Sequence, residues 1–225
     1  MERKVLRQLL RKFNKKCSGV FLHHKSYKES AHANLMTTLH AIIVPTGDFN
    51  SDVKRAKQGE REKSHLKDKG YYVISGALEE ISHIRESQRY LIYKRLRRGD
   101  VKPSQIKIEG KSHDTLENVL YSLQLIKEKG GREVGIVSYP GHLDRFDDII
   151  KYGQKKGWID PSVRIHRIET DETNKDKLYE IFANILNKYK LKKLDQGKSP
   201  EQIRNESLVR NIKKIKNHVL GFYKT

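Results

Sequence analysis

Five short apolar runs recur along the middle of the chain, and each is followed by glycine or by polar residues. They read "HAIIVPTG", "YYVISG", "QIKIE", "EVGIVS" and "VRIHRI" and occupy residues 40–47, 71–76, 105–109, 133–138 and 163–168. Runs of this length that are rich in Val, Ile and Tyr and bounded by turn residues are typical of strands. We therefore predict a strand at each of them.

A helical pattern follows each predicted strand. The predicted helices cover residues 52–69, 78–97, 115–129, 142–156 and 172–190. The clearest of them spaces its apolar residues at i, i+3 and i+4: Leu116, Val119, Leu120, Leu123 and Ile126. This alternation predicts an α/β fold, a three-layer Rossmann-like open sheet of about five mainly parallel strands with helices on both faces.

Both ends of the chain have a basic, helical pattern. Residues 4–16 form an amphipathic helix in this interpretation, which can pack on the core or bind a membrane surface or a partner. Near the other end, Ser199 and Pro200 are typical of an N-cap and a first helical position. We predict a basic N-terminal helical extension, an α/β domain, and a basic C-terminal helical extension packed on that domain, at residues 1–38, 39–190 and 191–225.

The formal net charge of +19 is concentrated in these two ends. Residues 1–28 hold nine Lys or Arg and one acid, and residues 186–225 hold eleven Lys or Arg and three acids. Charge placed in this way attracts nucleic acid or another anionic surface, or it forms a solvated face. A nucleic-acid-associated protein that uses its basic termini is therefore an alternative function.

The sequence also disfavours several classes of protein. No segment reaches the ~18 consecutive apolar residues of a membrane helix, and the N-terminus lacks the apolar core of a secretory signal. The single cysteine, Cys17, excludes an intramolecular disulfide. The histidines at 23, 24, 32 and 40 lack the close spacing of metal ligands. We expect a soluble, cytoplasmic protein without a metal.

Glycine occurs in each of four strand-to-helix loops, at residues 45–48, 75–80, 109–118 and 138–145. In an open parallel sheet, ligands bind beyond the carboxyl ends of the strands, and glycine lets backbone N–H groups approach them. The helix N-termini that follow favour an anion. We therefore predict a site for a phosphate-, carboxylate- or nucleoside-type ligand at this edge of the sheet.

The third loop, "EGKSHDTLEN", is dense in hydrogen-bonding groups. Asp114 fits an N-cap and Glu117 can complete a capping-box-like exchange, which needs no functional role. Capping does not account for Glu109 at the end of the strand, nor for Asn118. We predict that Glu109 or Glu117 accepts hydrogen bonds or acts as a base. The neighbours that we expect to contact the ligand are Ser112, Thr115 and Asn118.

The fourth loop, "SYPGHLDR", adds Ser138, His142 and Arg145. A serine near a histidine suggests a nucleophile and a base, but the G-x-S-x-G elbow is missing, so hydrogen bonding to an anion is an equal interpretation. We predict that Arg145 holds a phosphate or carboxylate and that His142 transfers a proton. No phosphate-loop lysine motif and no dinucleotide G-x-G-x-x-G follow the first strand. A less favoured alternative is a divalent cation on Asp48, Glu109 and Glu117.

Taken in order, these residues resemble the YdcF-like family (domain of unknown function 218), which includes SanA- and ElyC-like proteins. The resemblance covers residues 40–168 and rests mainly on "S-x-x-T-x-E-N" and "S-x-x-x-H-x-x-R" in consecutive loops. The matching residues are Gly47, Arg61, Ser75, Gly76, Glu109, Ser112, Thr115, Glu117, Asn118, His142 and Arg145. The chain departs from the family pattern at Asp48 and Ala77, where a second glycine is usual.

The resemblance implies a Rossmann-like α/β fold, and one relative suggests S-adenosylmethionine binding, but no general reaction follows from it. We predict a small anionic or nucleotide-like ligand, with S-adenosylmethionine as one candidate. A phosphoester or nucleotide hydrolase, or a transferase, is a further alternative. The catalytic candidates are Glu109, Glu117 and His142. The predicted ligand-binding residues are Gly47, Asp48, Arg61, Ser75, Gly76, Ser112, Thr115, Asn118, Ser138 and Arg145.

Overall fold

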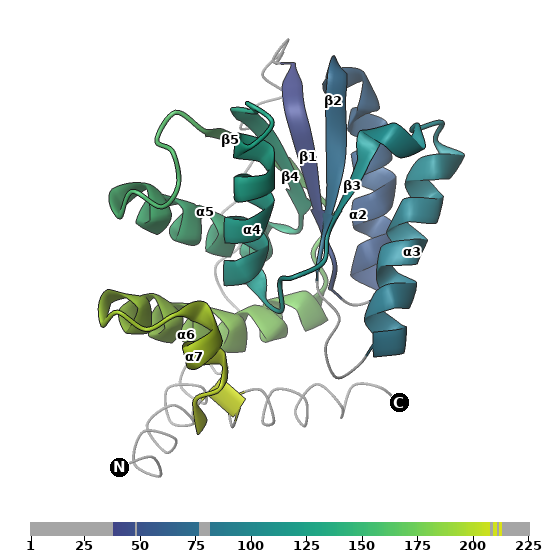
Figure 1. The fold of residues 1–225 in the computed structure, drawn as a ribbon. Helices are drawn as coiled ribbons and strands as arrows, with labels where there is room; N and C mark the ends of the chain where they lie inside the picture. Colours follow the sequence, from purple (N-terminus) through teal and green to yellow (C-terminus); the bar gives the residue numbers. More distant parts are fainter. Residues whose placement is uncertain (1–37, 48, 77–81, 208, 211, 213–225) are drawn as a thin grey trace, which may run out of the picture. The chain divides into compact units, whose positions relative to one another are not determined.

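The computed structural model describes residues 38–212 apart from residues 48, 77–81, 208 and 211. A sheet of parallel strands lies at the centre, in the order β3-β2-β1-β4-β5 (Figure 1). The strands are β1 (Leu39–Pro45), β2 (Leu66–Ser75), β3 (Ile106–Glu109), β4 (Glu133–Ser138) and β5 (Arg164–Glu169). The prediction of a mainly parallel open sheet is confirmed.

Helices cover both faces of this sheet, which gives the three predicted layers. They are α2 (Phe49–Arg61), α3 (Ser82–Arg98), α4 (Thr115–Lys127), α5 (Pro140–Lys155), α6 (Asn174–Asp195) and α7 (Pro200–Arg204), with short 3-10 turns η1 (Glu62–His65) and η2 (Pro103–Gln105). Alternate residues of β1 point to opposite faces. Ile42 packs in the core under α2 and α3, and Ile43 packs in the core under α4 and α5.

The main difference from the sequence prediction concerns residues 62–69, which we expected to be helical. The helix ends at Arg61, and β2 already begins at Leu66. Leu66 pairs with Leu39 of β1, whereas the side chains of Lys67, Asp68 and Lys69 are exposed. Three exposed polar residues in a row after Leu66 carry no apolar alternation, so the sequence pattern could not reveal this part of the strand.

The C-terminal part of the chain packs on the sheet face that carries α4 and α5. Ser199 caps α7 by accepting a hydrogen bond from Gln202 N, and Pro200 is the first helical residue, as predicted. Val209 and Ile212 are buried in the same core as Leu143 of α5. The predicted N-terminal helix at residues 4–16 lies outside the described residues. Among the residues that are described, no helix is long and apolar enough to cross a membrane.

Candidate functional site

The parallel register brings the ends of the strands together at one edge of the sheet. Ser75, the last residue of β2, pairs with Pro45 of β1 and with Glu109 of β3. Ser138, the last residue of β4, lies beside Glu169 of β5. Because the strands run in the same direction, the loops after β1 to β4 and the N-termini of α2, α4 and α5 meet there. We call this side of the sheet the carboxyl edge.

The buried Glu109 carboxylate holds the loop that follows β3. Its Oε1 accepts hydrogen bonds from the backbone N–H groups of Lys111 and Ser112, at 2.6 and 3.1 Å. Its Oε2 accepts from Ser75 Oγ at 2.9 Å and from Ser112 Oγ. The Oδ1 atom of Asn118 accepts from the same two hydroxyls, at 3.1 and 2.5 Å. The structure thus brings four predicted site residues into one buried cluster.

The donors and acceptors of this cluster balance. Each serine hydroxyl has one proton, so the hydroxyls of Ser75 and Ser112 together can donate one hydrogen bond to Glu109 Oε2 and one to Asn118 Oδ1. The other Glu109 oxygen accepts hydrogen bonds from two backbone N–H groups. Glu109 therefore fixes the position of the loop after β3, and its predicted catalytic role stays a prediction.

The two acidic residues at the start of α4 are held in a capping arrangement. Asp114 is the N-cap and accepts from Glu117 N at 3.1 Å. The Glu117 carboxylate accepts a hydrogen bond from His113 N at 2.6 Å. In a regular capping box this bond comes from the N–H group of the N-cap residue, whereas His113 is one residue before the N-cap. Burial, and then the Asp114 carboxylate, raise the pKa of Glu117. Lys190 pairs with Asp114, and Arg204 lies 3.7 Å from Glu117.

His142 is buried between hydroxyl groups and guanidinium groups. Its Nδ1 atom lies 2.8 Å from Ser138 Oγ and 3.3 Å from Arg55 Nη2. Its Nε2 atom lies 3.3 Å from Thr115 Oγ1. Burial, and then the positive charges of Arg145 and Arg55, lower the pKa of His142 well below 6.5. The imidazole is therefore neutral at pH 7.

The direction of these hydrogen bonds follows from Arg55, because a guanidinium group only donates. Arg55 Nε donates to Ser138 Oγ at 3.1 Å, so Ser138 can give its own proton to His142 Nδ1. The ring proton then lies on Nε2 and is donated to Thr115 Oγ1, which also accepts from Arg145 Nη1 at 2.7 Å. In this assignment the Thr115 hydroxyl keeps a proton that it can donate to another acceptor.

Arg145 forms a buried ion pair with Glu180 of α6. Its Nε and Nη2 atoms donate to the two Glu180 oxygens at 2.6 and 2.9 Å. The Tyr139 hydroxyl donates to the same carboxylate at 2.8 Å. Since Nη1 is bound to Thr115, each nitrogen of the guanidinium has a partner within the protein. Arg145 orients Thr115 in this structure, and its predicted contact with a ligand stays a prediction.

Arg61 does not lie with the other predicted site residues, and its predicted contact with a ligand stays a prediction. It is exposed in the last turn of α2, away from the carboxyl edge where this helix begins. Arg55, which we did not predict, occupies the site instead. The sequence pattern that could have identified Arg55 is a helical spacing. Asp52, Arg55, Ala56 and Gly59 are three or four residues apart, which places them on the one face of α2 that packs on the sheet.

The glycines at the ends of β1 and β2 permit close approaches. A Cβ atom on Gly47 would lie 2.5 Å from Arg55 Nη1, and Gly47 N donates to Asp52 at 2.7 Å. Gly76 has a φ of +149°, and a Cβ atom there would lie 1.9 Å from Thr46 Oγ1. Both predicted glycines therefore stand at this edge. The predicted ligand-binding residue Asp48 lies outside the described residues.

Helix α6 crosses the carboxyl edge. Asp176, in its first turn, lies 3.5 Å from the Ser51 hydroxyl at the start of α2. Glu180 holds α5 through the ion pair described above, and Lys190 pairs with Asp114 before α4. Figure 1 shows α6 passing the end of α4 at which that helix begins. The sequence analysis predicted this helix but not its path.

Carboxylates of the chain itself already lie at two helix N-termini of this edge. Asp114 caps α4, and Gly141 N in the first turn of α5 donates to Glu172 at 3.2 Å. Burial is the main cause of the raised pKa of Glu172. A helix N-terminus favours an anion through its free N–H groups and its dipole. Glu172 therefore stands where an external phosphate or carboxylate could bind.

Within the described ranges, no group of three His, Cys, Asp or Glu side chains gathers as metal ligands. The alternative cation site on Asp48, Glu109 and Glu117 stays a prediction, because Asp48 lies outside the described residues and the other two carboxylates accept hydrogen bonds from backbone N–H groups. Comparisons with protein families, with curated proteins and with solved structures give no match to this chain. The resemblance to the YdcF-like family therefore stays a prediction.

Proposed function

We propose that the protein binds a small anionic or nucleotide-like ligand at the carboxyl edge, against the loops that follow β3 and β4. One observation carries the proposal: the hydrogen bonds that run from Arg55 through Ser138 and His142 leave the Thr115 hydroxyl with a proton to donate. Thr115 is half-buried, so a ligand can reach it. A phosphate or carboxylate oxygen is a suitable acceptor for this proton.

The burial of so many polar groups at one edge supports the proposal. Most of the buried polar side chains of the described residues lie there, with Ser122 and Asn187 among the exceptions. Buried ion pairs are often no more stabilising than apolar residues of the same volume, so they are a weak device for stability alone. Perturbed and buried titratable groups cluster at functional sites.

The helix N-termini favour an anion over a neutral ligand. In the proposed complex, a phosphate or carboxylate takes the place of Glu172 at the N-terminus of α5. The raised pKa of Glu172 indicates that its charge is poorly solvated there, which makes the exchange less costly.

The resemblance to the YdcF-like family adds S-adenosylmethionine as a specific candidate. Its carboxylate matches a site that offers the Thr115 hydroxyl as a donor beside helix N-termini. In a reaction at this site, His142 is the group suited to move a proton, because its ring is neutral and both of its nitrogens face hydroxyls.

A thermal-shift experiment on the full chain tests the proposal. The probes are S-adenosylmethionine, adenosine monophosphate and ribose 5-phosphate, each from micromolar to millimolar concentration. We expect at least one of them to raise the melting midpoint in proportion to the logarithm of its concentration. Thr115→Val, which removes the hydroxyl and keeps the shape, should weaken binding about tenfold, as expected for a lost hydrogen bond to a charged group.

Thr38→Val is the matched control, because Thr38 is exposed before β1 at the opposite edge of the sheet. It should bind the probe as the unaltered chain does. The proposal fails if none of the probes shifts the midpoint, or if Thr115→Val and the control bind equally well. Glu109→Ala is a second variant: it removes the oxygen that accepts from the N–H groups of Lys111 and Ser112, so the loop should move and binding should be lost.

A further inference from the structure

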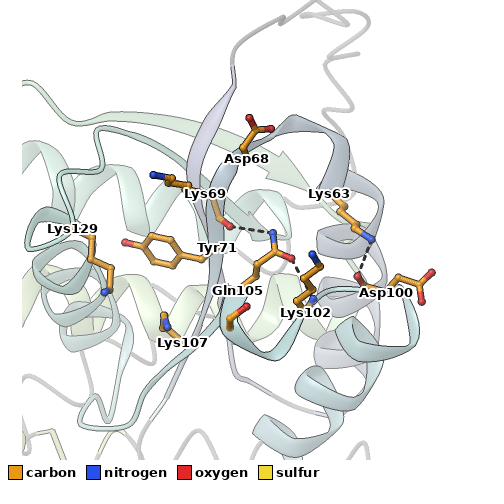
Figure 2. Close-up of a pocket in the computed structure, with 11 residues that line it drawn as sticks. Lys63, Asp68, Lys69, Tyr71, Asp100, Lys102, Gln105, Lys107 and Lys129 are labelled. Atoms are coloured by element: carbon orange, nitrogen blue, oxygen red, sulfur yellow. Dashed lines mark hydrogen bonds between the residues drawn. The ribbon is translucent and has the colours of Figure 1, made fainter.

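A hollow of about 610 Å³ lies at the opposite edge of the sheet, at the amino ends of β2 and β3 (Figure 2). We call it the lysine hollow, because five of its lining residues are lysines. The complete lining is Lys63, Asp68, Lys69, Gly70, Tyr71, Asp100, Lys102, Ser104, Gln105, Lys107 and Lys129. Its size falls within the ~300–1,000 Å³ of small-molecule sites. The proposed function uses none of these residues.

The register of the sheet explains why lysines from separate elements meet here. Lys107 of β3 pairs with Val73 of β2, so both side chains point to the face that carries α4. Tyr71 lies two residues before Val73 and shares that face. Lys129 follows the end of α4 on the same side of the sheet. These residues therefore converge on one hollow instead of forming a stripe along one helix.

Tyr71 gives this hollow an unused hydrogen-bond donor. Its side chain is 8% exposed, and its hydroxyl has no hydrogen-bond partner among the described residues. Burial raises the pKa of Tyr71 to about 12, so the hydroxyl keeps its proton at neutral pH. A buried hydroxyl without a partner is unfavourable, and a ligand oxygen that accepts its proton would offset that cost.

The ammonium groups around Tyr71 are also without partners. Within the described part of the chain, the side chains of Lys69, Lys107 and Lys129 make no hydrogen bond or ion pair. Figure 2 shows these three lysines around the Tyr71 ring. It also shows the carboxylate of Asp68 directed away from Tyr71. Like charges that line one hollow repel each other, and a bound anion would offset that repulsion.

Two features separate this hollow from an ordinary basic surface. Lysines near helix C-termini are common because they offset the helix dipole, and that accounts for Lys129 after α4. It does not account for Lys69 and Lys107, which are strand residues. Nor does it account for a buried tyrosine whose hydroxyl is left unpaired beside them.

We propose that the lysine hollow binds a compact anion with two or three linked phosphate groups, and that Tyr71 donates a hydrogen bond to one phosphate oxygen. Several ammonium groups around one open hollow match an anion that carries several charges close together. The linked phosphates can belong to inorganic tripolyphosphate or to a nucleoside triphosphate, and the two are distinguished by experiment. This site is independent of the carboxyl edge.

Isothermal titration calorimetry of the full chain with sodium tripolyphosphate, without divalent metal, tests the proposal. Tyr71→Phe should weaken binding about tenfold or more, as expected for a lost hydrogen bond to a charged group. Because the hydroxyl has no partner among the described residues, this variant should melt at the same temperature as the unaltered protein or higher. A loss of binding in Tyr71→Phe therefore cannot come from unfolding.

Lys107→Ala should also weaken tripolyphosphate binding about tenfold, the cost of one charge-assisted contact. Lys151→Ala is its matched control, because Lys151 is an exposed lysine of α5 outside the hollow. Equal losses in the two variants would show attraction to net charge alone and overturn the proposal. Binding that Tyr71→Phe leaves unchanged would overturn it as well.

Further titrations identify the molecule that supplies the phosphates and show which of the two proposed sites binds it. Adenosine triphosphate that binds more tightly than tripolyphosphate, with the same loss in Tyr71→Phe, assigns the hollow to a nucleotide. Binding of a single-stranded oligonucleotide but not of tripolyphosphate would contradict a site for a compact anion. Thr115→Val should bind tripolyphosphate normally, so failure of the carboxyl-edge proposal and failure of this one are separable.

Discussion

Arg55 and Arg61 lie on the same helix, yet their surroundings are opposite. Arg55 is 2% exposed, and its three nitrogens contact Pro45 O, Asp52, Ser138 and His142. Arg61 is exposed, and its guanidinium meets Gln58 at 3.4 Å. The residue type alone does not separate them. What decides their roles is which side of α2 faces the sheet.

This contrast predicts different costs of substitution. Arg55→Ala leaves Asp52 buried without its cationic neighbour, so we expect a loss of ~3–5 kcal/mol in the free energy of unfolding. Arg61→Ala is the control and should change that free energy by less than about 0.5 kcal/mol. Urea denaturation followed by circular dichroism measures both. Equal effects of the two substitutions would contradict the account of α2.

His142 predicts how stability depends on pH. Its folded-state pKa is lowered by burial and by the two arginines, so the unfolded chain takes up a proton near pH 6.5 while the folded chain does not. The free energy of unfolding therefore decreases as the pH falls below about 6.5, by at most about 1.4 kcal/mol per pH unit for this one group. The contribution is complete above that pH.

The measurement compares the unfolding free energy at pH 7 and pH 5.5 for the unaltered chain and for His142→Asn. The variant should lose less stability on acidification than the unaltered chain does. The raised pKa values of Glu117 and Glu172 act in the opposite direction, and the subtraction removes them. An identical pH dependence in His142→Asn would contradict a buried, neutral imidazole.

At the scale of elements, α6 shows where reading the sequence reaches its limit. The strands and the helices between them were predicted because burial on two faces leaves apolar runs, and one exposed face leaves a helical stripe. The predicted loops after β2, β3 and β4 did supply residues to one edge, because parallel strands end together. The path of α6 after the last strand follows from contacts such as Lys190 with Asp114, and no local pattern encodes them.

The same limit applies to partners within the site. Ser75, Glu109, Ser112 and Asn118 were predicted to lie at one edge of the sheet because they follow parallel strands. Glu180 was not predicted, because an acid in the middle of a helix is usually solvated and only the packing of α6 on α5 buries it. Residues 66–69 were predicted wrongly as helix, since their polar side chains hide the strand.

The ion pair between α5 and α6 gives a prediction at this scale. Glu180→Ala leaves the Arg145 guanidinium buried without its carboxylate, which should cost ~3–5 kcal/mol of unfolding free energy. Glu201→Ala on α7 is the control, because Glu201 is exposed and lies 4.0 Å from Arg204, a pair worth about 0–1 kcal/mol. Chemical denaturation measures both. Equally small losses of unfolding free energy in the two variants would contradict a stabilising ion pair between α6 and Arg145.

At the scale of the whole described domain, the two edges of the sheet differ in how their charges are arranged. At the carboxyl edge, acids and bases are buried and paired, and Thr115 keeps one proton to donate. At the amino edge, five lysines and two aspartates line a hollow, and Lys69, Lys107 and Lys129 make no ion pair with a described residue. The first arrangement favours a ligand recognised by directed hydrogen bonds, and the second favours a ligand recognised by charge.

Titration of the full chain with S-adenosylmethionine and with adenosine monophosphate, followed by amide shifts in two-dimensional NMR, tests the central claim most directly. We predict that the shifted amides lie in residues 46–47, 110–115 and 139–142, the loops of the carboxyl edge. Absence of shifts with both compounds, or shifts confined to residues 63–71 and 100–107 around the lysine hollow, would contradict it.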